Sequence, residues 1–235
     1  MAVLEVERLS KVFGTGETAV HALREVTVSV DAGELAALLG PSGSGKSTLL
    51  LCTSLIEPPS AGAIAVRGRA VWRDGAALVD ARRFRRENIG FVFQGHNLIP
   101  FLTAEENVAL AMQLAGVGRR EAARRARDLL GYLEVGHRAG ALANEPPIVF
   151  ADEPTAALDT ERGMKVMALL RRVAREKRSA VIAVTHDERM IEGFDTVYEM
   201  NDGRLAQKLH APAPWKRAPH PSTAAAPSGP ASSWA

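Results

Sequence analysis

Between an apolar segment and a helical pattern the chain reads Gly40-Pro41-Ser42-Gly43-Ser44-Gly45-Lys46-Ser47, which matches G-x-x-x-x-G-K-[ST]. Its glycines let backbone N–H groups turn inward around phosphate oxygens, and the loop leads into a helix N-terminus, which favours an anion. In such a loop Lys46 reaches the β- and γ-phosphates, and the hydroxyl of Ser47 ligates Mg²⁺. The motif predicts a nucleoside triphosphate site; a glycine-rich turn without a ligand is the alternative.

A second segment supplies the carboxylates that such a site needs. The chain reads Ile148-Val149-Phe150-Ala151-Asp152-Glu153, an apolar strand pattern that ends in two acids. The carboxyl ends of parallel strands form the crevice in which these sheets bind ligands. Asp152 is therefore predicted to hold Mg²⁺ and Glu153 to polarise the attacking water. Two solvated acids at a strand end are the alternative.

Short apolar segments alternate with longer helical patterns, which predicts an α/β fold with a mostly parallel core sheet. Strands are predicted at Ala2–Glu7, Val26–Val30, Leu35–Leu39, Ile89–Phe93, Ile148–Ala151, Ala180–Val184 and Val197–Met200. Helices are predicted at Lys46–Leu55, Ala104–Ala115, Arg119–Leu133 and Glu161–Lys177. On the last helix one apolar face is formed by Met164, Met167, Leu170 and Val173 or Ala174. The block 104–133 holds two helical patterns and no strand pattern, so it predicts a helical insertion.

Composition and charge exclude several classes of protein. Lys and Arg number 29 against 27 Asp and Glu, a balance that gives no support to a dedicated nucleic-acid binder. The arginines at 82–86 and 119–127 are predicted to lie on solvated helix faces, so we expect no nucleic-acid partner. The single cysteine, Cys52, excludes an internal disulfide framework and fits a reducing compartment.

The distribution of apolar residues predicts neither a membrane-spanning helix nor a secretory signal. No apolar run approaches the ~20 residues of a membrane-spanning helix, and Met1–Ser10 lacks the apolar core of a secretory signal. We therefore expect a cytosolic chain that reaches a membrane only by docking to another protein. Residues 211–235 are mostly Pro, Ala and Ser, a composition that predicts a disordered tail.

The motifs resemble, in order and spacing, the nucleotide-binding subunits of ATP-binding cassette (ABC) transporters. Beyond the loop at 40–47, the resemblance rests on Asp152-Glu153-Pro154-Thr155, Ala157-Leu158-Asp159 and Val184-Thr185-His186-Asp187. It implies ATP and Mg²⁺ as cofactors and a P-loop NTPase cassette over residues 1–208, followed by a tail at 209–235. It also implies an N-terminal antiparallel β part and a helical subdomain at about 95–145.

The resemblance implies roles for individual residues. Gln94 would touch the metal or the attacking water, and His186 would contact the γ-phosphate; taken alone, this histidine is a capping or packing residue. Phe13 would stack on adenine, and Asp159 would lie at the interface between two cassettes. The implied catalytic residues are Glu153, His186 and Gln94, and the implied metal ligands are Ser47, Gln94 and Asp152. The implied nucleotide-binding residues are Phe13, Gly40, Ser42, Gly43, Ser44, Gly45, Lys46, Ser47, Thr48 and Asp159.

Partners follow from the same resemblance. The segment 97–108 is apolar for a loop; in isolation it is a core-packed connection, whereas in the family it lies near membrane-spanning subunits. Together with residues 23–26 and 55–57 it is most similar to the lipoprotein-release and macrolide-export branch of exporters. The resemblance implies membrane-spanning subunits and a second ATP-binding cassette as partners. It places the chain in the cytoplasm, peripheral on the inner face of the cell membrane.

One family motif is missing. The family carries Leu-Ser-Gly-Gly-Gln between the positions of Gln94 and Asp152, whereas here these residues are only 58 positions apart and residues 134–147 hold no such motif. In the family this signature of one cassette clamps ATP on the other. We therefore expect a shortened helical subdomain and ATP binding with little hydrolysis by a homodimer. A partner with an intact signature would complete the site built on Lys46, Asp152 and Glu153.

Four other interpretations of the gap are compatible with the sequence. Residues 134–140 would replace the clamp in an enzymatically normal cassette. Alternatively, the chain is a non-catalytic, nucleotide-dependent regulatory or partner-binding module. A soluble ABC ATPase of DNA repair or translation is a third interpretation, although such proteins usually carry two cassettes or long insertions. A deletion in the gene is a fourth.

Overall fold

The computed structural model describes residues 1–92, 102–114, 116–133, 146–156, 158–185, 191 and 193–210. Its helices are η1 (Gly16–Thr18), α1 (Lys46–Thr53), α2 (Ala81–Asn88), α3 (Ala104–Leu114), α4 (Arg119–Leu133) and α5 (Thr160–Lys177). Its strands are β1 (Ala2–Phe13), β2 (Val20–Asp31), β3 (Leu35–Leu39), β4 (Ala61–Val66), β5 (Arg69–Arg73), β6 (Ala76–Ala77), β7 (Ile89–Val92), β8 (Ile148–Asp152), β9 (Ala180–Val184), β10 (Thr196–Asn201) and β11 (Arg204–His210).

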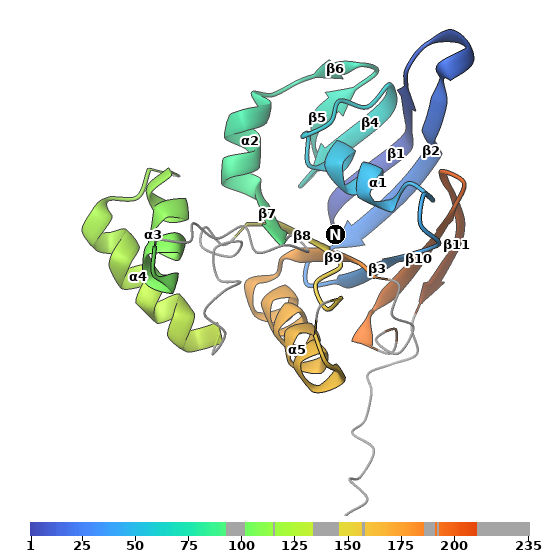
Figure 1. Cartoon of the computed structure of the whole chain (residues 1–235). Coiled ribbons are helices and arrows are strands. Elements are labelled where there is room, and N and C mark those ends of the chain that lie inside the picture. The colour runs from blue at the N-terminus through green and yellow to red at the C-terminus, as the bar shows by residue number, and fades with distance from the viewer. Residues whose placement is uncertain are drawn as a thin grey trace, which may run out of the picture.

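These strands form two sheets (Figure 1). One sheet has the order β2-β1-β4-β5-β6 and is antiparallel throughout. The other has the order β11-β10-β3-β9-β8-β7, in which only β11 runs antiparallel to its neighbour. The predicted α/β fold with a mostly parallel core sheet is therefore confirmed, as is the antiparallel N-terminal part that the family resemblance implied.

The parallel sheet is buried on both faces, as its short apolar strands predict. In β3, Ala36 and Leu38 belong to a cluster that joins both sheets with α1. The alternate residues of β3, Leu35 and Ala37, belong to a second cluster with α5 on the opposite face. Successive side chains of a strand point to opposite faces, so one five-residue strand connects the two halves of the core.

Several predicted bounds differ from the observed ones. β1 continues past Glu7 to Phe13, because irregular pairing around Arg8 breaks the alternation of apolar residues without ending the strand. β11 includes Leu209 and His210, which pair with Val197 and Thr196, so these two residues belong to the sheet and not to a tail. Residues 211–235 lie outside the described part of the chain.

On α5, one residue of the predicted apolar face, Met164, does not belong to the observed buried face. The buried side is formed by Val166, Met167, Leu169, Leu170, Val173 and Ala174, together with Gly163. Met164 is 42% exposed, so its predicted place among the buried residues is wrong. The wide buried face of this helix covers the sheet and includes positions 166 and 169, and Met164 lies beyond its edge.

The predicted helical insertion is confirmed as α3 and α4, which lie side by side at the edge of the molecule (Figure 1). Thr103 and Glu106 form a reciprocal cap at the start of α3: each accepts the other's backbone N–H through its side chain, at 2.8 and 3.2 Å. No helix among the described residues is long and apolar enough to cross a membrane.

Candidate functional site

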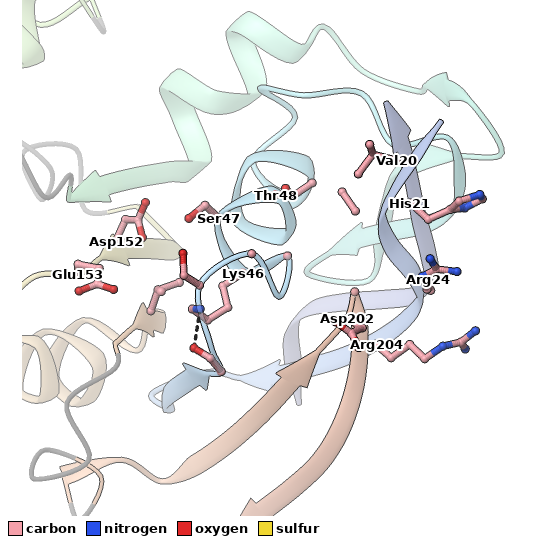
Figure 2. Close-up of a pocket in the computed structure, with 17 residues that line it drawn as sticks. Val20, His21, Arg24, Lys46, Ser47, Thr48, Asp152, Glu153, Asp202 and Arg204 are labelled. Carbon is pink, nitrogen blue, oxygen red and sulfur yellow. Dashed lines mark hydrogen bonds between the residues drawn. The ribbon is translucent and has the colours of Figure 1, made fainter. Parts of the chain in front are cut away.

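A pocket of about 880 Å³ lies over the glycine-rich loop, at the carboxyl end of the parallel sheet (Figure 2). Two walls come from motifs that the sequence singles out: the loop with the start of α1, and the end of β8. The third wall comes from β2 and from the turn between β10 and β11. The lining residues are Val20, His21, Ala22, Arg24, Gly40, Ser42, Gly43, Gly45, Lys46, Ser47, Thr48, Asp152, Glu153, Val184, Asp202, Gly203 and Arg204.

Two loop glycines are required by close backbone neighbours. Gly40 has φ +143°, and a Cβ there would lie 2.2 Å from the carbonyl oxygen of Met200 on β10. Gly45 has φ +100°, and a Cβ there would lie 2.5 Å from the carbonyl oxygen of Ala22 on β2. A backbone oxygen cannot move away as a side chain does, so only glycine fits either position. The loop is therefore held between β2 and β10.

The turn between β10 and β11 also holds the phosphate-binding loop, through hydrogen bonds of Gly203. The N–H of Gly203 donates to the carbonyl of Ser44 (3.1 Å), and the carbonyl of Gly203 accepts from the N–H of Arg24 (2.7 Å). One residue thus connects the phosphate-binding loop to β2. Sequence reasoning did not identify this wall, although the pair Asp202-Gly203 is a turn signal that a search for hairpins would have found.

The ammonium group of Lys46 is turned toward its own loop. Its Nζ donates to the carbonyls of Gly40 (2.7 Å) and Pro41 (2.8 Å) and lies 3.4 Å from the hydroxyl of Ser44. Burial lowers the pKa of Lys46, and the nearby carboxylates of Glu153 and Asp152 oppose that shift. An anion entering the loop would be a better partner for this ammonium than two neutral carbonyls.

The two carboxylates at the end of β8 differ in their surroundings. Burial raises the pKa of Asp152, and the negative charge of Glu153 raises it further, whereas Lys46 and a hydrogen bond from Ser47 lower it. Glu153 adopts a left-handed backbone conformation (φ +50°), and its N–H donates to the carbonyl of Val184 at 3.0 Å. The strand therefore ends at Asp152, and both acids line the pocket (Figure 2).

The donor set beside the loop suits a magnesium ion. The hydroxyl of Ser47 lies opposite the carboxylate of Asp152 in the pocket (Figure 2), and hydrogen bonding from it lowers the pKa of that carboxylate. Mg²⁺ prefers oxygen ligands and is usually bound by one or two protein groups together with phosphate oxygens and water. Two oxygen donors opposite a phosphate-binding loop fit that description.

Nine of the predicted site residues line this one pocket: Gly40, Ser42, Gly43, Gly45, Lys46, Ser47, Thr48, Asp152 and Glu153. Ser44 is 2% exposed, and its backbone N–H donates to the carbonyl of Pro41 within the same loop. Phe13 does not line the pocket, but Val20 does and is its direct partner across β1 and β2. Asp159 lies elsewhere and caps α5, because its carboxylate accepts the N–H of Arg162 at 2.8 Å. Gln94 and His186 lie outside the described residues.

Comparison with known proteins agrees with this site. The ABC transporter family matches residues 23–156 of the chain. The lipoprotein-releasing system ATP-binding protein LolD of Geobacter metallireducens is 38% identical, over 87% of this chain and 98% of that protein. The chain belongs to the ABC transporter family. It is a member of the ATP-binding, P-loop ATPase type, as its loop and its β8 carboxylates predict.

Two further ABC proteins extend the comparison. The macrolide export ATP-binding/permease protein MacB 1 of Yersinia pestis is 37% identical over 87% of this chain and 34% of its own, longer chain. The ATP-binding cassette MJ0796, in a dimeric post-hydrolysis state bound to ADP and Pi, superposes with a TM-score of 0.80. It is 31% identical, over 89% of this chain and 99% of that chain.

The ABC relatives are longer than this chain within the aligned region. The alignment with the Geobacter protein runs over 222 positions. It takes in 87% of the 235 residues of this chain, which is about 204, so about 18 aligned positions have no counterpart here. The alignment with MacB 1 runs over 223 positions and takes in the same 87%. The chain is therefore internally shortened relative to these ABC proteins.

Proposed function

We propose that this chain is the ATP-binding subunit of an ABC exporter, and that it binds Mg²⁺–ATP in the pocket over residues 40–47. The observation that carries the proposal is the position of that loop opposite Asp152 and Glu153, within one pocket. The names of the relatives, a lipoprotein-releasing system and a macrolide exporter, support export as the direction. The finding that no described helix can cross a membrane is compatible with separate membrane-spanning subunits.

In the proposed site the loop amides surround the phosphates and α1 begins directly beneath them. The ammonium group of Lys46 gives up its hydrogen bonds to the two loop carbonyls and donates instead to oxygens of the β- and γ-phosphates. Ser47 and Asp152 would hold the metal. When bound, Mg²⁺ would neutralise part of the negative charge of the phosphates. Glu153 accepts a proton from the attacking water, which its place next to Asp152 at the pocket wall allows.

Four further roles belong to this proposal because the family motifs match at those positions. Gln94 contacts the metal or water, and His186 contacts the γ-phosphate. Asp159, at the start of α5, lies at an interface with a second cassette. Phe13 provides an aromatic surface for adenine, and its position opposite Val20 supports this role, because directly paired residues of antiparallel strands lie on the same face.

We further propose that the chain works at the cytoplasmic face of a membrane in a complex with membrane-spanning subunits and a second cassette. The shortening by about 18 aligned positions supports a missing segment, which we place where the family carries its signature motif, between Gln94 and Asp152. Two copies of this chain would then lack the clamp on both nucleotides. A second cassette with an intact signature would complete the site built on Lys46, Asp152 and Glu153, and the reciprocal site would stay inactive.

The test compares nucleotide binding with turnover in the purified full chain. We expect ATP to bind, and hydrolysis to stay within about twofold of the rate of a Glu153→Gln variant. Turnover that Glu153→Gln abolishes would show that the site closes by another route and would contradict the proposed impairment. Adding a signature-bearing cassette from one of the relatives is expected to raise hydrolysis, with Glu153→Gln in this chain removing the gain. No gain with any such cassette would favour a non-catalytic, nucleotide-dependent module.

A further inference from the structure

The charged side chain that contacts Phe13 is unusually deeply buried for a lysine. Lys11 is only 7% exposed, and lysines are rarely buried unless their charge is paired. Its Nζ donates to Oε1 of Glu57 at 2.5 Å and to the carbonyl of Pro58 at 2.7 Å. The same Nζ lies 4.7 Å from the centre of the Phe13 ring. An ammonium group has three donors; here a carboxylate and a carbonyl accept two of them, and the aromatic ring lies beside the same charge.

This arrangement fixes the ring of Phe13 from one side. A cation within about 6 Å of a ring centre is attracted by the negative face of the ring. Phe13 nevertheless stays 41% exposed, so the ring keeps a surface open to a ligand. An unsupported phenylalanine at the end of a strand would rotate about its side-chain torsions and would lose that freedom only when a base binds.

The partners of Lys11 belong to the segment that follows the phosphate-binding helix. Residues 54–57 continue directly from α1, and the N–H groups of Ile56 and Glu57 both donate to the carbonyl of Leu51. The segment is fastened to β1 a second time, because the hydroxyl of Ser60 accepts the N–H of Val12 at 3.0 Å. A continuous set of contacts therefore runs from Lys46 at the start of α1 to the ring of Phe13.

We propose that Lys11 is a positioning residue for the base: it holds one face of Phe13, leaves the other for adenine, and keeps that ring in register with the phosphate loop through Glu57 and Pro58. The inference rests on the proposed role of Phe13. It predicts that Lys11 affects the base and not the phosphates, which separates it from a residue that only stabilises the fold.

The test uses two probes that the full chain does not hydrolyse at this site, ADP and inorganic pyrophosphate, and measures the dissociation constant of each. Lys11→Met keeps an unbranched side chain that is one atom shorter, and it removes the charge. We expect it to weaken ADP binding about two- to fivefold and to leave pyrophosphate binding unchanged. Lys11→Arg retains a cation and is expected to restore ADP affinity. Glu57→Gln, which loosens the ammonium without removing it, is expected to give a smaller loss in the same direction.

A double variant separates this inference from the function on which it rests. Phe13→Ala should weaken ADP binding at least about fivefold, the size of a lost base–aromatic stack, and adding Lys11→Met to it should cause no further loss. Equal weakening of both probes by Lys11→Met, or a full effect of Lys11→Met without the ring, would overturn the positioning role alone. Unchanged ADP affinity in Phe13→Ala would instead contradict the proposed role of Phe13, and with it this inference.

Discussion

The nucleotide pocket and the α3–α4 pair differ in the interactions that stabilise each of them. Around the pocket, backbone groups approach each other so closely that Gly40 and Gly45 accept no side chain. Between α3 and α4, the buried residues are mostly small, namely Val108, Ala109, Met112, Ala122 and Ala126, and the surface carries several ion pairs. Exposed ion pairs contribute little to stability. The comparison indicates a rigid phosphate site beside a helical pair of lower local stability.

The largest effect is expected where the loop meets β2. Gly45 and Gly43 both have positive φ, +100° and +82°, but only a Cβ at Gly45 meets backbone, whereas a Cβ at Gly43 meets nothing within 4 Å. Gly43→Ala should lower the free energy of unfolding by about 1–2 kcal/mol, the cost of the left-handed conformation. Gly45→Ala should lower it by clearly more. Denaturant unfolding without nucleotide measures both, and equal losses would contradict the clamped loop.

The next effect concerns the buried core of the helical pair. Met112 is 2% exposed on α3, so Met112→Ala should cost about 2–5 kcal/mol of local stability. We expect faster amide hydrogen exchange in α3 and α4, with ADP affinity unchanged. Leu50→Ala in α1, a residue that is 1% exposed and packs in the other core cluster, is the matched control and should speed exchange around the pocket while leaving α3 and α4 unchanged. Loss of ADP affinity in folded Met112→Ala would show that the two regions are coupled.

A pH effect is expected in the helical pair, at Glu121 on α4. Hydrogen bonds from Arg124 and Arg125 lower the pKa of Glu121 on α4 from 4.5 to about 2. Because the folded pKa lies below the unfolded one, this pairing stabilises above about pH 4.5 and is lost as pH falls toward 2. Glu121→Gln should therefore speed hydrogen exchange in α4 at pH 7 and have a smaller effect at pH 3. A pH-independent effect would contradict the pairing.

The smallest effect is expected from the ion pair between the helices. Arg127 and Glu105 approach to 2.6 Å, with side chains 60% and 34% exposed. Arg127→Ala should lower stability by about 0.2–1 kcal/mol, and added salt should reduce that difference. Lys165→Ala, which removes a pair within α5, is the control with no interhelical component. An Arg127→Ala cost well above that of Lys165→Ala in high salt would mean that packing, not charge, joins the helices.

The sequence predicted the parts of the pocket that a short motif specifies. Residues 40–47 and Asp152-Glu153 carry their chemistry in residue type and spacing, and the structure brings them together. The wall formed by β2 and Gly203 was not predicted, since it depends on how β10 and β11 turn back onto the loop. β4 was not predicted either, because four of its six residues are alanine or glycine (Ala61-Gly62-Ala63-Ile64-Ala65-Val66), and such small residues are not typical of strands.

Helix faces were predicted less well than helix positions. Arg119–Leu133 was predicted with its observed bounds, because its charged and apolar residues alternate with a clear helical period. On α5, periodicity alone included Met164 among the buried residues, and the sheet covers a neighbouring face instead. Burial depends on the partner surface, which the periodicity of one helix does not contain.

The most direct measurement is the affinity of the purified full chain for Mg²⁺–ATP, by calorimetry, beside a Lys46→Met variant that keeps the stem of the side chain. We predict saturable binding of one nucleotide per chain and a loss of more than about tenfold in Lys46→Met, because an ammonium–phosphate contact of this kind is charge-assisted. Binding that is absent in the folded wild-type chain, or unchanged in Lys46→Met, would contradict the assignment of residues 40–47 as the nucleotide site.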